Sequence, residues 1–230
     1  MPSKRPRQGR FPPAAIAAAI SVAMAAAYVA DCARAAESRW EPDIRAFEKK
    51  DRERMPPPGG IVFVGSSSIR GWDVGKSFPD LPVVNRGFGG SQIADSVEFA
   101  GRIVIPYKPK TVVLYAGDND INAGKTPQQV LSDYREFVAK VHGPLPDAKI
   151  VFIAIKPSLR RWNLVSAMRE ANKLIREYSE SNAKLEFVDV DPPMIGADGK
   201  PRPELFVEDG LHMTAEGYRI WTALVRTLLQ

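Results

Sequence analysis

Five short apolar runs rich in β-branched residues recur along the chain, and they constrain its fold more than any other feature. They are IVFVG (61–65), PVVNRG (82–87), TVVLYAG (111–117), KIVFIAI (149–155) and LEFVDV (185–190). Each run has the length of a strand, and Gly, Pro or Asp bounds most of them. Uninterrupted apolar runs of this kind predict strands that are buried on both faces, as in a parallel sheet.

Segments with helical periodicity lie between these runs. Apolar side chains repeat at helical spacing over residues 130–141, 164–178 and 221–228. The sequence TPQQ at 126–129 predicts a helix start, with Thr at the N-cap, Pro at the first helical position and Gln completing a capping box. The alternation predicts one α/β domain, a flavodoxin-like three-layer α/β/α sandwich around a parallel sheet of about five strands.

The N-terminal segment 1–36 has the layout of an export signal. A basic stretch, MPSKRPRQGR, precedes an apolar, Ala-rich stretch, and Ala33–Ala36 (ARAA) provides small residues at the spacing of a cleavage site. An uncleaved membrane anchor is the alternative, because the apolar run approaches the length that spans a bilayer. We expect an exported protein, periplasmic or secreted, with a polar lead-in at 37–59 and the folded domain at 60–230.

The formal net charge of +5 does not indicate a nucleic-acid partner. Five of the 32 Lys and Arg residues and one of the 27 Asp and Glu residues lie before residue 37, which leaves +1 for the rest of the chain. No basic stripe remains to follow a phosphate backbone. Cys32 is the only cysteine, so the domain is expected to have neither an internal disulfide nor a thiolate metal site. We expect no cofactor, and nothing in the apolar pattern indicates a protein partner.

Polar and glycine-rich segments follow the predicted strands. The carboxyl ends of parallel strands meet at one edge of a sheet, and ligands of such folds bind there. The sequence therefore predicts a functional site built from segments that are far apart along the chain. These segments are GSSS (65–68), NRGFGGSQ (85–92), GDND (117–120) and EDGLHMT (208–214).

The residues of these segments fit nucleophilic catalysis. A nucleophilic serine needs a base within hydrogen-bond reach and an acid that orients the base, and Ser67, His212 and Asp209 provide all three. Donors must also face the developing oxyanion, and the backbone N–H of Gly90 and the side-chain amide of Asn119 can supply them. Each residue taken alone also fits an ordinary structural role, as a helix cap, a turn former or a surface pair.

Three other motifs fail in detail. GFGGSQ has Gln92 in place of the third Gly or Ala of a dinucleotide-binding loop. A calcium loop that starts at Asp118 would have its glycine one position late, at Gly124, and Gln129 at its twelfth position. GSSSI has Ile69 where the nucleophile elbow G-x-S-x-G requires glycine.

From about residue 58 to its C-terminus the chain resembles the SGNH hydrolases, also called the GDSL family of esterases and lipases. The family's blocks match Gly65-Ser66-Ser67, Gly90, Gly117-Asp118-Asn119-Asp120 and Asp209-Gly210-Leu211-His212, in that order. The resemblance implies that Ser67, Asp209 and His212 are catalytic and that Ser67, Gly90 and Asn119 form the oxyanion hole. Ser66 replaces the Asp that gives the motif its name, which implies a changed rate or pH profile rather than another reaction.

The expected function is a serine esterase that cleaves short acyl esters, for example O-acetyl groups on carbohydrate. No long apolar insertion indicates a lid, which argues against a triglyceride lipase. The alternative is a non-catalytic envelope protein of the same fold that binds acylated glycans. The expected partner is a small-molecule or glycan ester, and membrane contact is expected only through an uncleaved N-terminal segment. Candidates for lining the substrate site are Arg70, Arg86, Arg160, Arg161 and Trp162, although each also fits a solvated or packing role.

Overall fold

The structure is a computed structural model that describes residues 38–229. The predicted leader at 1–36 lies outside the described residues. From Pro42 onward the chain forms one compact unit, so the folded domain begins before the expected residue 60. Among the described helices, none is both long enough and apolar enough to cross a membrane.

Five parallel strands form one sheet, as the apolar runs predict. The strand order is β2-β1-β3-β4-β5, which is the flavodoxin-like order. Gly65 at the end of β1 pairs with Gly87 of β2 and Tyr115 of β3, so three strands end level at one edge. Every residue of β1 and β3 is buried, which explains their uninterrupted apolar sequences. The strands are β1 (Ile61–Gly65), β2 (Val83–Gly87), β3 (Thr111–Tyr115), β4 (Lys149–Ile153) and β5 (Leu185–Val188).

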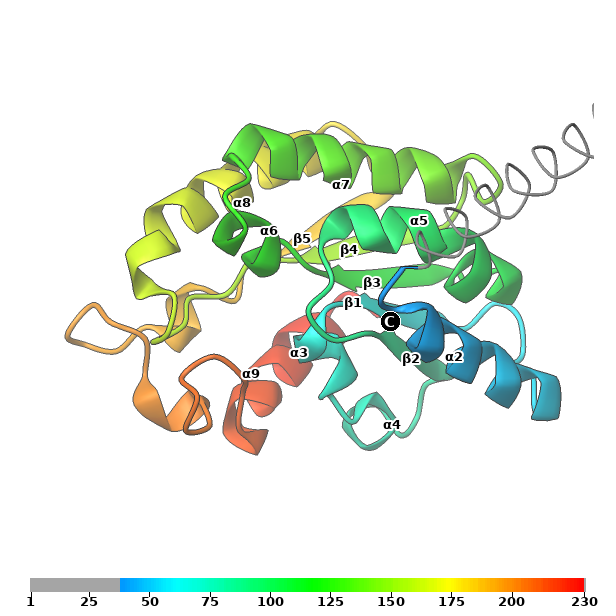
Figure 1. Ribbon diagram of the computed structural model, residues 1–230, viewed down its shortest axis with the longest axis horizontal. Helices are drawn as coiled ribbons and strands as arrows, with labels where there is room; N and C mark the ends of the chain where they lie inside the picture. The colour runs from blue at the N-terminus through cyan, green and yellow to red at the C-terminus, as the bar shows by residue number, and fades with distance from the viewer. Residues whose placement is uncertain (1–37, 230) are drawn as a thin grey trace, which may run out of the picture. The chain divides into compact units, whose positions relative to one another are not determined.

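Helices cover both faces of the sheet (Figure 1). One face carries α5 (Ile93–Ile103), α7 (Pro127–His142) and α8 (Val165–Glu180), which pack side by side. The other face carries α3 (Ser67–Arg70), α4 (Val74–Ser77) and α9 (Ala215–Arg226). The described chain also contains α2 (Glu41–Glu53), α6 (Asp118–Asn122) and short 3-10 turns at Ile105–Tyr107, Trp162–Leu164, Pro192–Met194 and Pro203–Leu205.

The predicted start of α7 is confirmed in detail. The hydroxyl of Thr126 accepts a hydrogen bond from the backbone N–H of Gln129 at 3.2 Å. In return, the Gln129 side chain accepts from the backbone N–H of Thr126 at 2.8 Å. The capping box therefore satisfies two N–H groups that the first turn of the helix leaves without a partner.

An aromatic cluster joins α3 and α9 to the sheet. The ring of Trp221 on α9 lies 4.7 Å from that of Tyr115 on β3 and 5.6 Å from that of Trp72, measured between centroids. The ring of Trp72, just after α3, lies 5.3 Å from Phe63 on β1. All four side chains are buried. Because α3 begins with Ser67 and α9 follows His212, this packing sets the positions of two predicted catalytic residues.

The polar lead-in contains a helix, α2, which the sequence patterns did not predict. Asp51 on α2 accepts a hydrogen bond from Arg86 at 2.5 Å and another from the hydroxyl of Tyr107. Arg86 is only 6% exposed, and its Nε donates to the same Tyr107 hydroxyl at 2.7 Å. The prediction that Arg86 lines the substrate site is therefore wrong, because its guanidinium is buried between α2 and the rest of the domain.

Candidate active site

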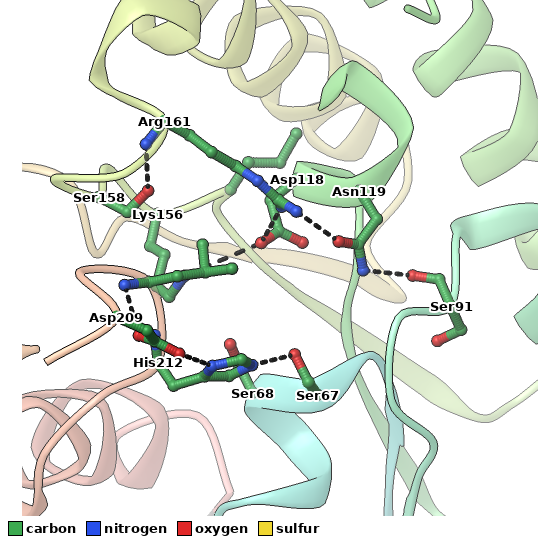
Figure 2. Close-up of polar contacts among 12 residues, drawn as sticks. Ser67, Ser68, Ser91, Asp118, Asn119, Lys156, Ser158, Arg161, Asp209 and His212 are labelled. Atoms are coloured by element: carbon green, nitrogen blue, oxygen red, sulfur yellow. Dashed lines mark hydrogen bonds and ion pairs between the residues drawn. The ribbon is translucent and has the colours of Figure 1, made fainter. Parts of the chain in front are cut away.

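The carboxyl edge of the sheet brings together the predicted segments (Figure 2). Ser67 begins α3 directly after β1, and Asn119 lies in α6 after β3. Arg161 follows β4, and His212 precedes α9. Since the strands end at the same edge, residues separated by long stretches of sequence lie within hydrogen-bond distance of one another.

Ser67, His212 and Asp209 form a continuous hydrogen-bonded chain. The His212 Nε2 atom lies 2.9 Å from the Ser67 Oγ atom, and the His212 Nδ1 atom lies 2.5 Å from the Asp209 Oδ2 atom. An ionised carboxylate can only accept, so Nδ1 carries the ring hydrogen and Nε2 is left to accept from the serine hydroxyl. This is the arrangement of a nucleophile, its general base and the acid that orients the base.

The Asp209 carboxylate is held by its own turn. Its Oδ1 atom accepts from the backbone N–H groups of Leu211 at 2.8 Å and His212 at 2.9 Å. Partial burial raises the pKa of Asp209, but the hydrogen bonds from His212 and Leu211 outweigh it and hold this pKa well below its usual range. The carboxylate therefore stays ionised and keeps the imidazole in one tautomer and one orientation.

Two backbone hydrogen bonds hold the loop that carries His212, one to another loop and one within the loop itself. The backbone N–H of Arg160, from the loop after β4, donates to the Gly210 carbonyl at 3.0 Å. Gly210 has a φ of +66°, which an L side chain adopts at a cost. The backbone N–H of Val207 donates to the His212 carbonyl at 2.8 Å. The loop is therefore held against the loop that follows β4, although the His212 and Asp209 side chains remain 42% and 37% exposed.

The turn between β1 and α3 requires glycine at position 65. Gly65 has a φ of +132°, and a Cβ atom there would lie 1.9 Å from the carbonyl oxygen of Tyr115. Ser66 follows, donates its backbone N–H to the same carbonyl at 2.9 Å, and is fully buried. Its hydroxyl has no hydrogen-bond partner among the described residues. The family position that Ser66 occupies thus lies beneath the site, and Ser67 is the serine that faces the imidazole.

Asn119 lies next to the loop that contains Gly90. Its Nδ2 atom donates to the carbonyl of Ser91 at 2.9 Å, and Gly90 has a φ of +76°. Its Oδ1 atom accepts from the Arg161 Nη2 atom at 2.9 Å. The structure therefore places both predicted oxyanion donors in one region, and it adds Arg161 as a direct contact of Asn119. The sequence marked Arg161 only as one of several basic residues after a strand.

The family assignment follows from a match over most of the domain. Residues 64–220 match the model of the GDSL-like lipase/acylhydrolase family. The chain belongs to this family. Membership confirms the resemblance in the sequence blocks and makes the protein a hydrolase of carboxylic esters.

Known relatives of this GDSL-like hydrolase cover most of its length. It is 25% identical over 189 residues to the platelet-activating factor acetylhydrolase IB subunit alpha1 of Homo sapiens, which covers 79% of each chain. A protein of Streptococcus pneumonia has the same fold, with a TM-score of 0.74 at 19% identity over 92% of this chain and 99% of that one. An acetyl-xylooligosaccharide esterase from Geobacillus Stearmophilus aligns with a TM-score of 0.60 at 16% identity, over 76% and 95%.

The remaining predicted substrate residues of the GDSL-like hydrolase lie around these loops. Arg70 is exposed at the end of α3, and its Nη1 atom would lie 3.0 Å from a Cβ atom placed on Gly89. Arg160 is exposed beside Gly210. Trp162 is half-buried, with the Arg169 guanidinium 5.6 Å from its ring centre. In residues 38–229, no three His, Cys, Asp or Glu side chains are grouped as a metal site would require.

Proposed function

We propose that this GDSL-like hydrolase is a serine esterase that removes short acyl groups, of acetyl size, from carbohydrate. The observation that carries the proposal is the hydrogen-bonded chain from Asp209 through His212 to Ser67. A protein that only binds its ligand has no need of a serine hydroxyl aligned on an imidazole that a carboxylate orients.

In the proposed mechanism, Ser67 attacks the ester carbonyl while His212 takes the hydroxyl proton on Nε2. Asp209 remains ionised and stabilises the imidazolium that forms. The oxyanion of the tetrahedral intermediate accepts from the backbone N–H groups of Ser67 and Gly90 and from the Asn119 amide. His212 then gives its proton to the leaving alcohol. Water, activated by His212, releases the acid from the acyl-serine and restores the hydroxyl.

The open site supports a large leaving alcohol. The side chains of His212 and Asp209 are 42% and 37% exposed, so a bulky alcohol part can remain outside the protein while its ester reaches Ser67. The exposure thus favours a large, solvated alcohol.

The relatives supply a second line of support for acetyl esters. The human relative is a platelet-activating factor acetylhydrolase, and one structural neighbour is an acetyl esterase with an acetate ion. Two further neighbours are an acetyl-xylooligosaccharide esterase and a carbohydrate esterase from Talaromyces cellulolyticus. The alcohols in these names differ, whereas the acetyl group recurs, and two of the neighbours act on carbohydrate.

The test combines active-site labelling with a substrate panel. A fluorophosphonate probe should label Ser67, as located by peptide mapping, and should not label Ser67→Ala. Hydrolysis of p-nitrophenyl acetate should exceed that of the octanoate by at least tenfold in kcat/KM, and acetylated xylo-oligosaccharides should release acetate. A folded protein with no labelled serine and no ester hydrolysis would contradict the proposal and favour the alternative, a non-catalytic protein that binds acylated glycans.

We also propose that the enzyme acts outside the cytoplasm, in the periplasm or the medium. The support is the basic stretch, the apolar run and the small residues at Ala33–Ala36. Expression of the full chain, followed by fractionation and N-terminal sequencing, tests this proposal. A mature protein that begins near Glu37 supports export with cleavage, an intact N-terminus in the membrane fraction supports an anchor, and an intact cytoplasmic protein contradicts both.

A further inference from the structure

Arg161 donates a hydrogen bond to the oxygen atom of the Asn119 side chain. The Arg161 Nη2 atom donates to Asn119 Oδ1 at 2.9 Å, while Nη1 donates to Asp118 Oδ2 at 2.9 Å. The two acceptors are consecutive residues of α6, and the two donors belong to one planar guanidinium. Figure 2 shows the guanidinium lying across both side chains.

These contacts determine which way the Asn119 amide points. A guanidinium has only donors, so the Asn119 atom that faces Arg161 must be the oxygen. The carbonyl of Ser91 can only accept, so the atom 2.9 Å from it must be the Nδ2 nitrogen. The amide is therefore fixed at both ends, and the second Nδ2 hydrogen has a defined direction. A flipped amide would face Arg161 with a second donor and would lose both hydrogen bonds.

Arg161 is itself held firmly. Its side chain is 12% exposed, and that of its partner Asp118 is 5% exposed. The backbone N–H of Arg161 donates to the Ser158 hydroxyl at 3.3 Å, and Lys156 Nζ lies 3.9 Å from the same Asp118 oxygen that Arg161 contacts. A rotamer-rich side chain that donates to two fixed acceptors loses its freedom on folding rather than during the reaction. The guanidinium is thus suited to hold a neighbour in place.

We propose that Arg161 is a positioning residue of the oxyanion hole, which fixes Asn119 with its Nδ2 hydrogen towards the developing oxyanion. The inference rests on the proposed function, because it takes Asn119 to be an oxyanion donor. Oxyanion donors contribute to turnover only when they are already aligned before charge develops. Without Arg161, the amide can rotate or flip, and the donor is lost for part of the time.

The competing role is structural, since Arg161 also neutralises the buried carboxylate of Asp118. Arg161→Lys separates the two roles. An ammonium can still pair with Asp118, but it lacks the planar guanidinium that donates to two acceptors at fixed positions. We therefore expect Arg161→Lys to keep its melting temperature within about 3 °C while its kcat for p-nitrophenyl acetate falls by about tenfold or more, a fraction of the ~100- to 1,000-fold that one oxyanion donor supplies.

Several matched measurements complete the experiment. KM should change by less than about threefold, because the donor acts on the transition state rather than on the bound ester. The affinity for phenylboronic acid, which forms a tetrahedral adduct on the serine, should fall by about the same factor as kcat. Arg176→Lys is the control, since Arg176 on α8 also pairs with a carboxylate, Asp189, but is 46% exposed and lies outside the site, and its kcat should stay within about twofold.

A double-mutant cycle with Asn119→Ala identifies the route of the effect. If Arg161 acts through Asn119, adding Arg161→Lys to Asn119→Ala should lower kcat by less than about threefold further. An equal tenfold loss in both backgrounds would overturn the inference, as would an Arg161→Lys protein with unchanged kcat. If Arg161→Lys is unstable, Asp118→Asn/Arg161→Met removes both charges of the pair, and the same loss and the same cycle are expected.

Two different outcomes would overturn the proposed function and the positioning role of Arg161. A parent protein whose ester hydrolysis does not depend on Ser67 would overturn the proposed function, and the positioning role would fall with it. A Ser67-dependent parent with a fully active Arg161→Lys variant would overturn the positioning role alone.

Discussion

The His212 Nε2 atom lies 2.9 Å from the Ser67 Oγ atom, although 145 residues separate the two along the chain. The contact depends on the packing beneath it. Ser67 opens α3 and His212 precedes α9, and the ring of Trp72, just after α3, lies 5.6 Å from the ring of Trp221 on α9. The aromatic core therefore fixes the distance on which the proposed proton transfer depends.

The first prediction concerns the serine triplet. Ser67→Ala and His212→Ala should each lower kcat on p-nitrophenyl acetate by about a million-fold, as for the nucleophile and base of a comparable triad. The matched control is Ser66→Ala. Ser66 is fully buried and its hydroxyl has no partner among the described residues, so its loss should change kcat by less than about threefold. Comparable losses in Ser66→Ala and Ser67→Ala would contradict the assignment of the nucleophile.

The second prediction compares two glycines. In Gly65→Ala the new methyl group would lie 1.9 Å from the Tyr115 carbonyl oxygen at a φ of +132°, so the β1–α3 turn cannot form as it stands. We expect a protein destabilised by more than about 4 kcal/mol, which few single substitutions reach. Gly101 lies exposed within α5, and a methyl group there would meet no atom of another segment within 4 Å. Gly101→Ala should therefore stabilise the protein by about 0.5–1 kcal/mol. Urea unfolding measures both, and equal effects would contradict the steric argument.

Much of the fold was predictable because burial on both faces of a sheet leaves a clear mark in sequence. The five strands, their parallel direction and the helix start at Thr126 all depend on local patterns, and all are confirmed. The meeting of Ser67 and His212 also follows from topology, since both lie where strands or their loops end. Uninterrupted apolar runs indicate buried strands directly, and apolar repeats with a period of 3.6 residues indicate helices.

Other features could not be read from local pattern. The helix α2 buries Ile44 but is otherwise mostly polar, so it lacks a broad apolar stripe. Arg86 lies near the end of β2 and Arg161 in the loop after β4, yet Arg86 is buried against Asp51 and Arg161 contacts Asn119. Which carboxylate or amide a long arginine side chain reaches depends on the packing of distant segments, which spacing along the chain does not record.

The third prediction follows from the corrected position of Arg86. Arg86→Met leaves the Asp51 carboxylate, whose side chain is 13% exposed, without its cation. Breaking a buried pair in this way costs about 3–5 kcal/mol, or roughly 10 °C in melting temperature for a domain of this size. Below its melting temperature the variant should keep kcat within about twofold, because Arg86 does not reach the site. A large loss of turnover in the folded variant would contradict this position.

Arg102→Met is the control for Arg86→Met. Arg102 also pairs with α2, through Glu48 at 2.7 Å, but their side chains are 35% and 32% exposed. Solvent screens such a pair, so its loss should cost less than about 1 kcal/mol. Thermal melting of both variants separates the buried anchor of α2 from the exposed one. Equal losses would mean that burial does not decide the difference.

The last prediction concerns Lys156, which is 1% exposed beneath the site. Its Nζ atom has no hydrogen-bond partner among the described residues, and the Asp118 oxygen 3.9 Å away already accepts from Arg161. Burial lowers the pKa of Lys156, and the attraction of Asp118 offsets this only in part. Keeping the ammonium charged therefore destabilises the folded state.

The sign of the pH dependence follows from this lowered pKa. Between the folded pKa and the unfolded value of about 10.4, the unfolded chain binds more protons, so the free energy of unfolding of the parent rises with pH. Lys156→Met removes the charge, so its advantage is greatest below the folded pKa and disappears above the unfolded one. At pH 7 we expect the variant to be more stable by about 1–4 kcal/mol, as when buried ions are replaced by apolar groups of similar volume.

Urea unfolding at pH 7 and at pH 9.5 measures the effect, with the exposed Lys140→Met as the control. The control should differ from the parent by less than about 0.5 kcal/mol at both pH values. The difference between Lys156→Met and the parent should shrink at the higher pH, because the parent then loses part of its buried charge. A Lys156→Met protein that is less stable than the parent at pH 7 would mean that Asp118 needs two cations, and that the buried ammonium stabilises the loop beneath the catalytic residues.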